Sequence, residues 1–409
     1  MKHPRILTAF TISCLLIITL NSFNFSQFHW RTTQVAEFCS EAPITLGTNF
    51  RTQCGDIYLN MKGDSKLGPW AYLRATNSSN SRSISDIKDL VVVEQNFENL
   101  GRFVEVSTDH QGRPHEKILE KSFEEKKSLA LRILSAQSQA DIIIGVEIKD
   151  IQTATDFAEK FLNGLYQPIL IEGNDQRGID VCYFVKKDLP FDFEIQSHRN
   201  LLSDNRNQTT PSELPAFSRD LPVLLIRERS SSPNTTPLMM LAATHFKAQN
   251  PDPKKDEKAT ERRTEQVKKS VQVLKSYEKK YPKLPIMIIS GDFNNDIRTS
   301  PEFAPLKDFG FTDSMNVTKD GSSPPLSQRG TQYFFTPKKE ISNEQLDSIM
   351  VKYEGQDYIK SAFILRDLDP NGKPRPQPKT EDEIALRASD HDGTLTVFDF
   401  EKIYQDLKK

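Results

Sequence analysis

Short, uninterrupted runs of apolar residues recur along the chain, and polar residues bound each run. Such runs are typical of strands buried on both faces of a sheet. Between them, two segments carry apolar residues at every third or fourth position, which is the spacing of an amphipathic helix. The pattern predicts helices over residues 116–137 and 258–281. It predicts strands at residues 90–93, 141–146, 179–185, 222–226, 238–243, 285–289, 346–351 and 395–400.

The predicted strands and helices alternate over most of the chain, but not in regular strand–helix–strand repeats. This order favours an α/β fold with a mixed sheet arrangement flanked by helices over a barrel. Polar, Pro- or Ser-rich loops interrupt it at residues 74–86, 229–237 and 369–383. The first loop is the expected linker between two regions. The predicted organisation is an N-terminal extension of unknown role at residues 28–88, a main domain at 89–400 and a C-terminal tail at 401–409.

The N-terminus has the pattern of an export signal. Lys2, His3 and Arg5 precede residues 6–20, an apolar stretch without a charged residue. The stretch is short for a spanning helix, which needs about 20 apolar residues. No clear small-residue cleavage site follows, so an uncleaved anchor is the alternative. We therefore predict that residues 1–27 are a signal peptide or signal anchor. The remainder would be extracellular or periplasmic, or membrane-anchored with the domain outside the cytoplasm.

Charge and cysteine content narrow the options further. The chain has 54 basic and 56 acidic residues and a formal net charge of −2, so its overall field does not attract polyanions and a nucleic-acid contact must be a local patch. Cys39 and Cys54 lie close in the sequence and are candidates for a disulfide in an oxidising compartment. No cysteine or histidine spacing fits a structural zinc site.

Polar side chains follow several of the predicted strands at the point where each strand ends. Strand ends deliver side chains to loop-lined sites. Oxygen ligands without cysteine select a hard cation such as Mg²⁺, Mn²⁺ or Ca²⁺, and histidines beside them suit proton transfer. The combination indicates metal-assisted hydrolysis of a phosphate ester. The residues are Asn96, Glu147, His245, Asp292, Asn294, Asp347, Asp390 and His391.

The motifs around these residues occur in the order seen in one superfamily. They are Asn96-Phe97-Glu98-Asn99-Leu100, Gly145-Val146-Glu147, Arg177-Gly178-Ile179-Asp180-Val181, Thr244-His245-Phe246-Lys247, Gly291-Asp292-Phe293-Asn294, Asp347-Ser348-Ile349 and Ser389-Asp390-His391. Over about residues 89–400 the chain resembles the endonuclease/exonuclease/phosphatase superfamily, which includes pancreatic-type DNases, abasic-site endonucleases, sphingomyelinases and inositol-polyphosphate phosphatases. The first and third motifs are most similar to predicted bacterial extracellular nucleases. The resemblance implies a two-sheet α/β sandwich with helices on its outer faces.

The resemblance also implies a role for each residue. Glu147 would bind the metal with the help of Asn96 and Asp390, and the cation would be Mg²⁺, with Mn²⁺ or Ca²⁺ as alternatives. His391, oriented by Asp347, would be the general base for the attacking water. Asp292 and Asn294 would position that water and the scissile phosphate. His245 and Arg219 would contact the phosphate or assist the leaving group.

The sequence departs from the family pattern at Val146, Ser348 and Asp392, where the family usually has Gln, His or Arg, and Pro. None of these removes a proposed ligand, but Asp392 adds negative charge beside a site that must accept a phosphate. Arg177 and Asp180 are equally consistent with a structural ion pair. A solvated helix face is the preferred interpretation of Arg262-Arg263.

These observations predict an exported, metal-dependent phosphodiesterase whose leading substrate is nucleic acid. A lipid phosphodiesterase or phosphatase of the sphingomyelinase or inositol-phosphate kind is the enzymatic alternative, and membrane association through an uncleaved anchor would suit it. A catalytically silent binding module is a third hypothesis, which the intact set of polar residues disfavours. No protein partner is predicted.

Overall fold

The computed structural model describes residues 56–60, 70–74, 82–108, 114–135, 138–204, 214–229, 231, 235–249, 259–321, 323–335, 341–369 and 371–409. The predicted export segment, residues 1–27, and the candidate disulfide pair Cys39 and Cys54 lie outside these ranges. Cys182 lies inside them, in the fully buried interior of a strand, with its thiol free.

One large sheet has six strands, in the order β17 (Ile359–Leu365), β18 (Gly393–Asp399), β3 (Asp89–Leu100), β6 (Ile142–Ile148), β8 (Asp180–Lys186) and β7 (Tyr166–Leu170). β3 and β6 run parallel, with Val92 beside Ile142, and the other neighbours are antiparallel. The parallel pair is important for the site, because the carboxyl ends of β3 and β6 meet at the same edge of the sheet.

The second large sheet has eight strands, in the order β1 (Asp56–Asn60), β2 (Trp70–Arg74), β9 (Phe191–Gln196), β10 (Val223–Glu228), β11 (Met239–His245), β12 (Met287–Asp292), β16 (Asp347–Lys352) and β13 (Phe311–Asp313). β11 and β12 run parallel, whereas β12 and β16 run antiparallel. The ends of β11 and β12 therefore lie beside the start of β16.

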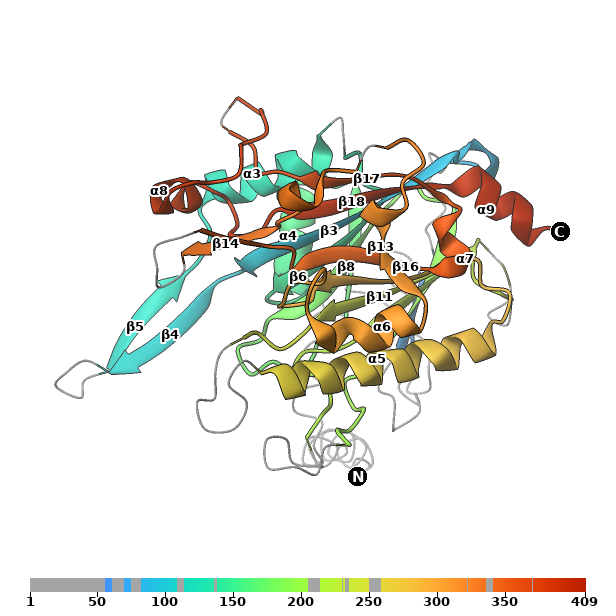
Figure 1. Ribbon diagram of the computed structural model, residues 1–409, viewed down its shortest axis with the longest axis horizontal. Coiled ribbons are helices and arrows are strands. Elements are labelled where there is room, and N and C mark those ends of the chain that lie inside the picture. The colour runs from blue at the N-terminus through green and yellow to red at the C-terminus, as the bar shows by residue number, and fades with distance from the viewer. Residues whose placement is uncertain are drawn as a thin grey trace, which may run out of the picture.

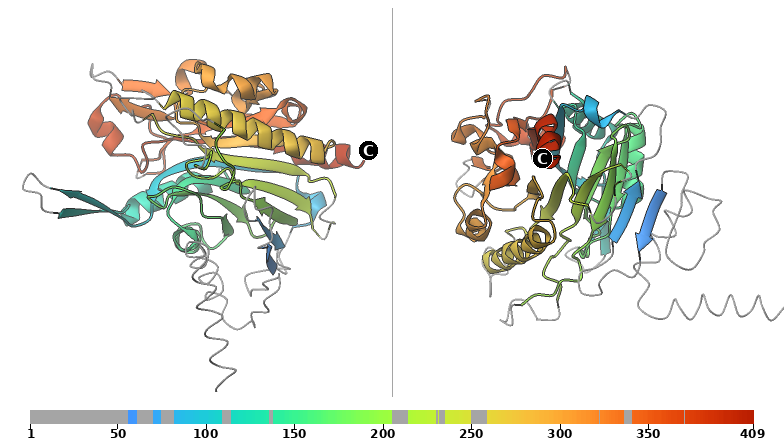
Figure 2. Two further views of the ribbon diagram at one scale, coloured as in Figure 1. Left: turned by 90° about the horizontal axis from the view of Figure 1, so that it is seen from below. Right: turned by 90° about the vertical axis from the view of Figure 1, so that its right-hand side faces the viewer.

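The two large sheets pack face to face around one core. This core joins side chains of both sheets, such as Val92 and Ile144 from one sheet with Leu241 and Ile288 from the other. Their alternate, outward-pointing residues form two further cores beneath helices. Figure 2 shows the two layers edge-on, with helices outside them.

Helices cover both outer faces. α5 (Thr260–Lys280) and the short α6 (Ala304–Asp308) pack on the eight-stranded sheet, where Val267 and Leu274 join a buried cluster, and α5 runs along the body in Figure 1. On the six-stranded sheet, α3 (Phe123–Leu134) and α4 (Ile151–Lys160) bury Ile133 and Phe157. The structure thus confirms the predicted two-sheet α/β sandwich with helices on its outer faces.

The remaining elements are short helices and two small hairpins outside the two large sheets. α7 (Tyr353–Gln356), α8 (Glu381–Ala385) and α9 (Phe400–Leu407) are short. Two small hairpins are formed by β4 (Phe103–Thr108) with β5 (Pro114–Leu119) and by β14 (Gln332–Phe335) with β15 (Ile341–Glu344). The β4–β5 hairpin projects far from the body, at the end of the molecule opposite α9 (Figure 1).

The predicted helix over residues 116–137 is wrong in its first part. Residues 114–119 form β5, in which Ile118 pairs with Val104 across the hairpin. The helix begins only after Ser122, whose hydroxyl accepts the Glu125 N–H (3.2 Å) while the Glu125 carboxylate accepts the Ser122 N–H (2.7 Å). This capping box fixes the start, and spacing alone had not located it.

Elements from the segments on both sides of residues 89–400 join the sandwich. β1 and β2 come from the segment predicted as an N-terminal extension, yet β2 pairs with β9 at the edge of the eight-stranded sheet. The predicted tail is helix α9, which places Phe400 and Ile403 in the core between the sheets. Over the ranges that the structure describes, no helix has the length and apolar character to cross a membrane.

Candidate active site

Five strands, from both large sheets, bring predicted polar residues together at one end of the sandwich. Asn96 and Glu147 lie at the ends of the parallel strands β3 and β6. On the facing sheet, His245 stands beside Asp292 in the β11–β12 register, and Asp292 stands beside Asp347 in the β12–β16 register. The predicted residues thus meet because both sheets deliver strand ends to the same place.

The backbone around this place is strained in an unusual way. Glu98, Asn99, Glu147 and Asn294 adopt left-handed conformations, with φ of 46°, 59°, 63° and 54°. Such conformations cost a residue with a side chain roughly 1–3 kcal/mol and persist where surrounding contacts enforce them. Here the Asn99 N–H donates to Glu147 Oε2 at 3.0 Å, which holds the two strand ends together and turns the Glu147 carboxylate toward the site.

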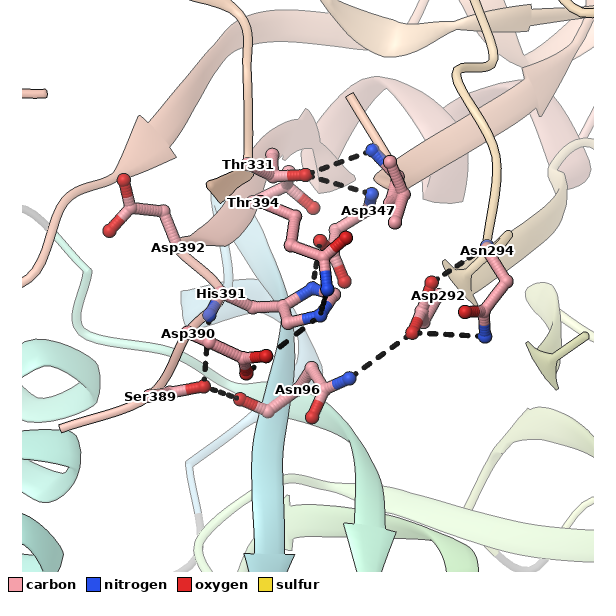
Figure 3. Close-up of polar contacts among 12 residues, drawn as sticks. Asn96, Asp292, Asn294, Thr331, Asp347, Ser389, Asp390, His391, Asp392 and Thr394 are labelled. Atoms are coloured by element: carbon pink, nitrogen blue, oxygen red, sulfur yellow. Dashed lines mark hydrogen bonds and ion pairs between the residues drawn. The ribbon is translucent and has the colours of Figure 1, made fainter. Parts of the chain in front are cut away.

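His391 and Asp347 form a buried imidazole–carboxylate pair (Figure 3). His391 Nδ1 lies 2.6 Å from Asp347 Oδ2, and neither side chain is more than 4% exposed. Thr331 Oγ1 accepts the N–H groups of Leu346 and Asp347, both at 3.0 Å. Burial by itself would lower the pKa of His391, but the Asp347 and Asp390 carboxylates outweigh it and raise that pKa well above its ordinary value.

Asp292 accepts hydrogen bonds from both asparagine side chains of the site. Its carboxylate accepts the Asn294 N–H at 2.7 Å, the Asn294 side-chain amide at 3.2 Å and the Asn96 amide at 3.2 Å (Figure 3). Burial raises the pKa of Asp292 to about 7, with His391 opposing the shift and Asp347 adding to it. The predicted residues Asn96, Asp292 and Asn294 are thus one connected group.

His245 faces the same group from β11. Its Nε2 lies 3.6 Å from Glu147 Oε1 and 3.6 Å from Asp292 Oδ2. Burial, followed by the nearby Arg219 and Arg177, lowers the pKa of His245 well below its ordinary value. A neutral imidazole is therefore favoured, which suits a hydrogen-bonding contact with a phosphate better than protonation of a leaving group.

The residues predicted to hold a metal have the chemistry that a hard cation requires. Glu147 and Asp390 are carboxylates close enough that burial and then Asp390 raise the pKa of Glu147, and the Asp390 side chain is 39% exposed at the mouth of the site. Asn96 offers its amide oxygen, which accepts the Glu98 N–H at 2.8 Å. Repulsion between the two carboxylates would be relieved by a divalent cation, so the donor set fits one.

A second arrangement of donors lies beside the first. Asp292, Asp347 and His391 each offer one ligand atom within 4.8 Å of the other two, and all three are buried. Such a group is able to hold a metal ion, although His391 Nδ1 and Asp347 Oδ2 already bond to each other. Asp347 Oδ1 has no hydrogen-bond partner, which leaves one oxygen for a further ligand.

Arg219, predicted to contact the phosphate, is buried beside the site. Its Nε lies 3.0 Å from Asp175 Oδ2, and its Nη1 donates to the Phe246 carbonyl at 3.1 Å. Arg177 binds the same Asp175, with Nε 3.2 Å from Oδ1. Arg177 is thus paired with Asp175, while Asp180 Oδ1 accepts the Gly173 N–H at 2.7 Å.

Two expectations about charge are corrected by burial. Asp392 does not add free negative charge to the site, because its carboxylate is fully buried and contacts Arg366 (2.7 Å) and Arg387 (2.8 Å). Burial acts to raise the pKa of Asp392, but these arginines lower it below its ordinary value. Arg263 is not on a solvated face: it is buried and pairs with Glu302 at 2.5 Å.

Two residues that the strand-end pattern does not predict contact His391. Gln332 Nε2 lies 3.0 Å from His391 Nε2. Arg132 donates to the His391 carbonyl at 3.0 Å and to Gln95 Oε1 at 2.9 Å. Arg132 lies within helix α3, and Gln332 lies on β14 of a small hairpin. Neither residue stands at the end of a strand of the two large sheets. Position relative to an apolar run therefore could not identify them.

No family model matches the sequence, and no curated protein matches it. Solved structures resemble it at low identity. An endonuclease/exonuclease/phosphatase family protein from Bacteroides thetaiotaomicron is 14% identical, over 76% of this chain and 97% of that chain, with a TM-score of 0.46. The human Nocturnin catalytic domain with bound sulfate is 18% identical, over 76% and 94%, with a TM-score of 0.47.

A third solved structure, a mannosyl-6-phosphatase from Bacteroides thetaiotaomicron, is 15% identical over 75% of this chain and 98% of that chain, with a TM-score of 0.46. The first of the three carries the name of the family that the sequence motifs resemble. Evidence for a particular activity comes from the residues of the site itself.

Proposed function

We propose that this protein is a metal-dependent phosphoesterase that hydrolyses phosphodiester bonds. One observation carries the proposal: the buried His391–Asp347 pair, with 2.6 Å between Nδ1 and Oδ2, sits beside a cluster of acidic and amide side chains that fits a hard cation and a phosphate. A base, an orienting carboxylate and a cation-binding carboxylate are the parts that such hydrolysis needs.

In this mechanism His391 removes a proton from water. A cation held by Asp390 would offset one of the carboxylates that raise the pKa of His391. The neutral imidazole, with its Nδ1 proton held by Asp347, then presents Nε2 as the proton acceptor, and the Asp347 carboxylate stabilises the imidazolium that forms. The water oxygen attacks phosphorus, its proton passes to Nε2, and the bond from phosphorus to the leaving oxygen breaks with its electron pair. The leaving oxygen then takes a proton from solvent.

The other side chains hold the phosphate. Asn294 and His245 would donate hydrogen bonds to phosphate oxygens, and Arg219 supplies a buried positive charge on the same side. Glu147, Asp390 and Asn96 would hold a divalent cation, Mg²⁺ in the first instance, which when bound neutralises charge on a nonbridging phosphate oxygen.

Nucleic acid is the leading substrate in this proposal, and the support for it is the likeness of the motifs to bacterial extracellular nucleases. Burial of Asp392 in an arginine network favours it further, because that carboxylate no longer repels a polyanion. A lipid phosphodiester is the second candidate. We propose export from the cytoplasm on the apolar N-terminal stretch, residues 6–20, with its basic flank.

A substrate panel tests the proposal. The full chain is incubated with plasmid DNA, RNA, sphingomyelin vesicles and a phosphomonoester, with Mg²⁺, Mn²⁺, Ca²⁺ or chelator. We expect cleavage of nucleic acid that chelator abolishes and that His391→Gln reduces. Absence of turnover on every substrate in every metal would contradict the enzyme proposal. Cleavage of the lipid alone would replace the nuclease with the lipid phosphodiesterase.

The metal assignment has its own readout. A bound cation stabilises the folded state, so Mg²⁺ or Mn²⁺ at a hundred times its dissociation constant should stabilise the protein by about 2.7 kcal/mol. Glu147→Gln is expected to remove most of that stabilisation, measured by thermal melting with and without metal. If Asp292→Asn removes it and Glu147→Gln does not, the cation belongs to the group formed by Asp292, Asp347 and His391.

A further inference from the structure

The residue that faces the proton-accepting nitrogen of His391 is a glutamine. With Nδ1 bonded to Asp347, Nε2 is the nitrogen left for the water, and it lies 3.0 Å from the amide nitrogen of Gln332 and 3.9 Å from Asp390 Oδ1. The backbone brings the two residues together in an isolated β-bridge. A glutamine therefore occupies the place at which the attacking water must meet its base.

The segment that carries Gln332 is fixed on both sides of it. Thr331 Oγ1 accepts the Asp347 N–H at 3.0 Å, a contact visible in Figure 3. The Tyr333 hydroxyl donates to Asp392 Oδ2 at 3.1 Å. Thr331 and Tyr333 are buried, whereas Gln332 is partly exposed. The backbone is thus held on both sides of Gln332, whose own side chain is only partly buried.

We propose that Gln332 is a water-positioning residue of the hydrolysis reaction, and this inference rests on the proposed phosphoesterase function. Its amide nitrogen, which meets His391 Nε2 directly, donates instead to the oxygen of a water that enters between the two. The same water donates one hydrogen to Nε2. Two of the four tetrahedral directions of the water are then fixed, and a lone pair is left for phosphorus.

The chemical step follows from this arrangement. The water oxygen forms a bond to phosphorus, and its hydrogen moves to His391 Nε2. The bond from phosphorus to the leaving oxygen breaks with its electron pair, and that oxygen is protonated by solvent. Gln332 gains and loses no proton, and its N–H remains hydrogen-bonded to the attacking oxygen throughout.

Two variants isolate this role. Gln332→Met keeps the length of the side chain but removes the donor, and Gln332→Glu keeps its shape but replaces the donor with an acceptor. Gln405→Met makes the first change on the exposed face of α9, where the amide bonds only weakly to Glu401 at 3.4 Å, and serves as the matched control. Each is assayed on the phosphodiester that the unmutated protein cleaves fastest.

We expect Gln332→Met to lower kcat by about 10- to 100-fold, the scale of a misplaced reactant, with KM within about two-fold of the original. Gln332→Glu should be at least as slow. Methanol is then added as a competing acceptor, and the methyl ester is measured against the hydrolysed product. The methionine side chain gives the methyl group of methanol an apolar neighbour but gives water no hydrogen bond. The ratio of methyl ester to hydrolysed product should therefore rise about 3- to 10-fold in Gln332→Met.

The outcomes separate the two claims. An unmutated protein that turns over no phosphodiester contradicts the proposed function and, with it, the role of Gln332. An active unmutated protein with kcat and product ratio unchanged in both variants contradicts the role of Gln332 alone. A fall in kcat with an unchanged product ratio and a melting temperature lowered in step would mean that Gln332 is structural, which also overturns the inference.

Discussion

The tautomer of His391 depends on a single carboxylate. Asp347 Oδ2 bonds to Nδ1 at 2.6 Å, and the Asp347 backbone is itself held by Thr331. Because the carboxylate only accepts hydrogen bonds, it keeps the proton of a neutral imidazole on Nδ1 and leaves Nε2 for the role of the proposed base. Whether His391 can serve as the proposed base therefore depends on Asp347 alone.

Asp347→Asn should reduce kcat by about 10²–10⁴-fold, because an amide can donate to Nδ1 and favour the tautomer with its proton on Nε2. KM should change little, since in the proposed mechanism Asp347 acts through His391. Steady-state kinetics measure both constants. The control is Asp156→Asn on the surface of α4, where Asp156 pairs with Lys160. Equal kcat in both variants would contradict the assigned role of Asp347.

A second histidine affects stability and lies away from the base. His198 is 1% exposed, its Nδ1 donates to the Leu221 carbonyl at 2.7 Å, and burial lowers the pKa of His198 to about 4. The unfolded chain, with an ordinary histidine pKa near 6.5, binds the proton first as pH falls. The stability that neutral His198 contributes is therefore present above about pH 6.5 and is lost as pH falls toward 4.

His198→Asn should weaken this dependence, because the asparagine amide can replace the Nδ1 donor but does not titrate. The unmutated protein should lose up to about 3 kcal/mol more than the variant between pH 7 and pH 4. Urea unfolding at several pH values measures the difference. Asp220, whose pKa burial raises to about 6, acts in the opposite direction but is present in both proteins. Parallel pH profiles would contradict the assignment.

At the scale of elements, β12 places Asp292 through a close approach to β11. Gly291 has a φ of +138°, and a Cβ built there would lie 1.9 Å from the Thr244 carbonyl oxygen. Both the conformation and the contact exclude a side chain. The close packing of the parallel strands β11 and β12 thus requires a glycine directly before Asp292. This requirement explains the Gly-Asp order in the sequence motif.

Gly291→Ala should destabilise the protein by about 3 kcal/mol or more, because the alanine would have a positive φ and its Cβ would clash with the Thr244 carbonyl oxygen. Gly372→Ala is the control, because Gly372 also has a positive φ, +76°, but a Cβ there would meet nothing within 4 Å. It should cost only about 1–2 kcal/mol. Chemical denaturation measures both, and equal losses would show that strain alone explains Gly291.

The whole molecule closes with a helix where the sequence predicted a tail. α9 inserts Ile403, fully buried, between the sheets, and Phe400 packs its ring 5.2 Å from that of Phe191. The Tyr404 hydroxyl donates to Glu228 on the facing sheet at 2.8 Å. α9 therefore helps to hold the two sheets together at the end of the sandwich opposite the β4–β5 hairpin (Figure 1).

Ile403→Ala should lower the free energy of unfolding by about 2–5 kcal/mol, because it leaves a cavity in the shared core. The matched change Ile118→Ala, on a side chain that is 54% exposed in the projecting hairpin, should cost within about 1 kcal/mol. Urea midpoints compare the two. Similar losses would contradict the packing role given to α9.

The sequence by itself determined the class of fold and predicted most members of the candidate site. Apolar runs mark buried strands because burial on both faces is a local property of each segment, and Asn96, Glu147, His245, Asp292 and Asp347 were found because they follow or begin such runs. The sequence shows where each strand ends. Neighbouring parallel strands end at the same edge of a sheet, which brings their last side chains together.

Only the tertiary structure decided which charges remain free and which side chains touch the base. Asp392 looked like a charge beside the phosphate until its arginine partners, 26 and 5 residues away in the chain, were seen to bury and neutralise it. Gln332 lies 59 residues from His391, on a hairpin without an apolar run. Ion pairs and hydrogen bonds across such separations leave no periodic pattern, because their geometry is set by the packing of elements that the sequence does not place side by side.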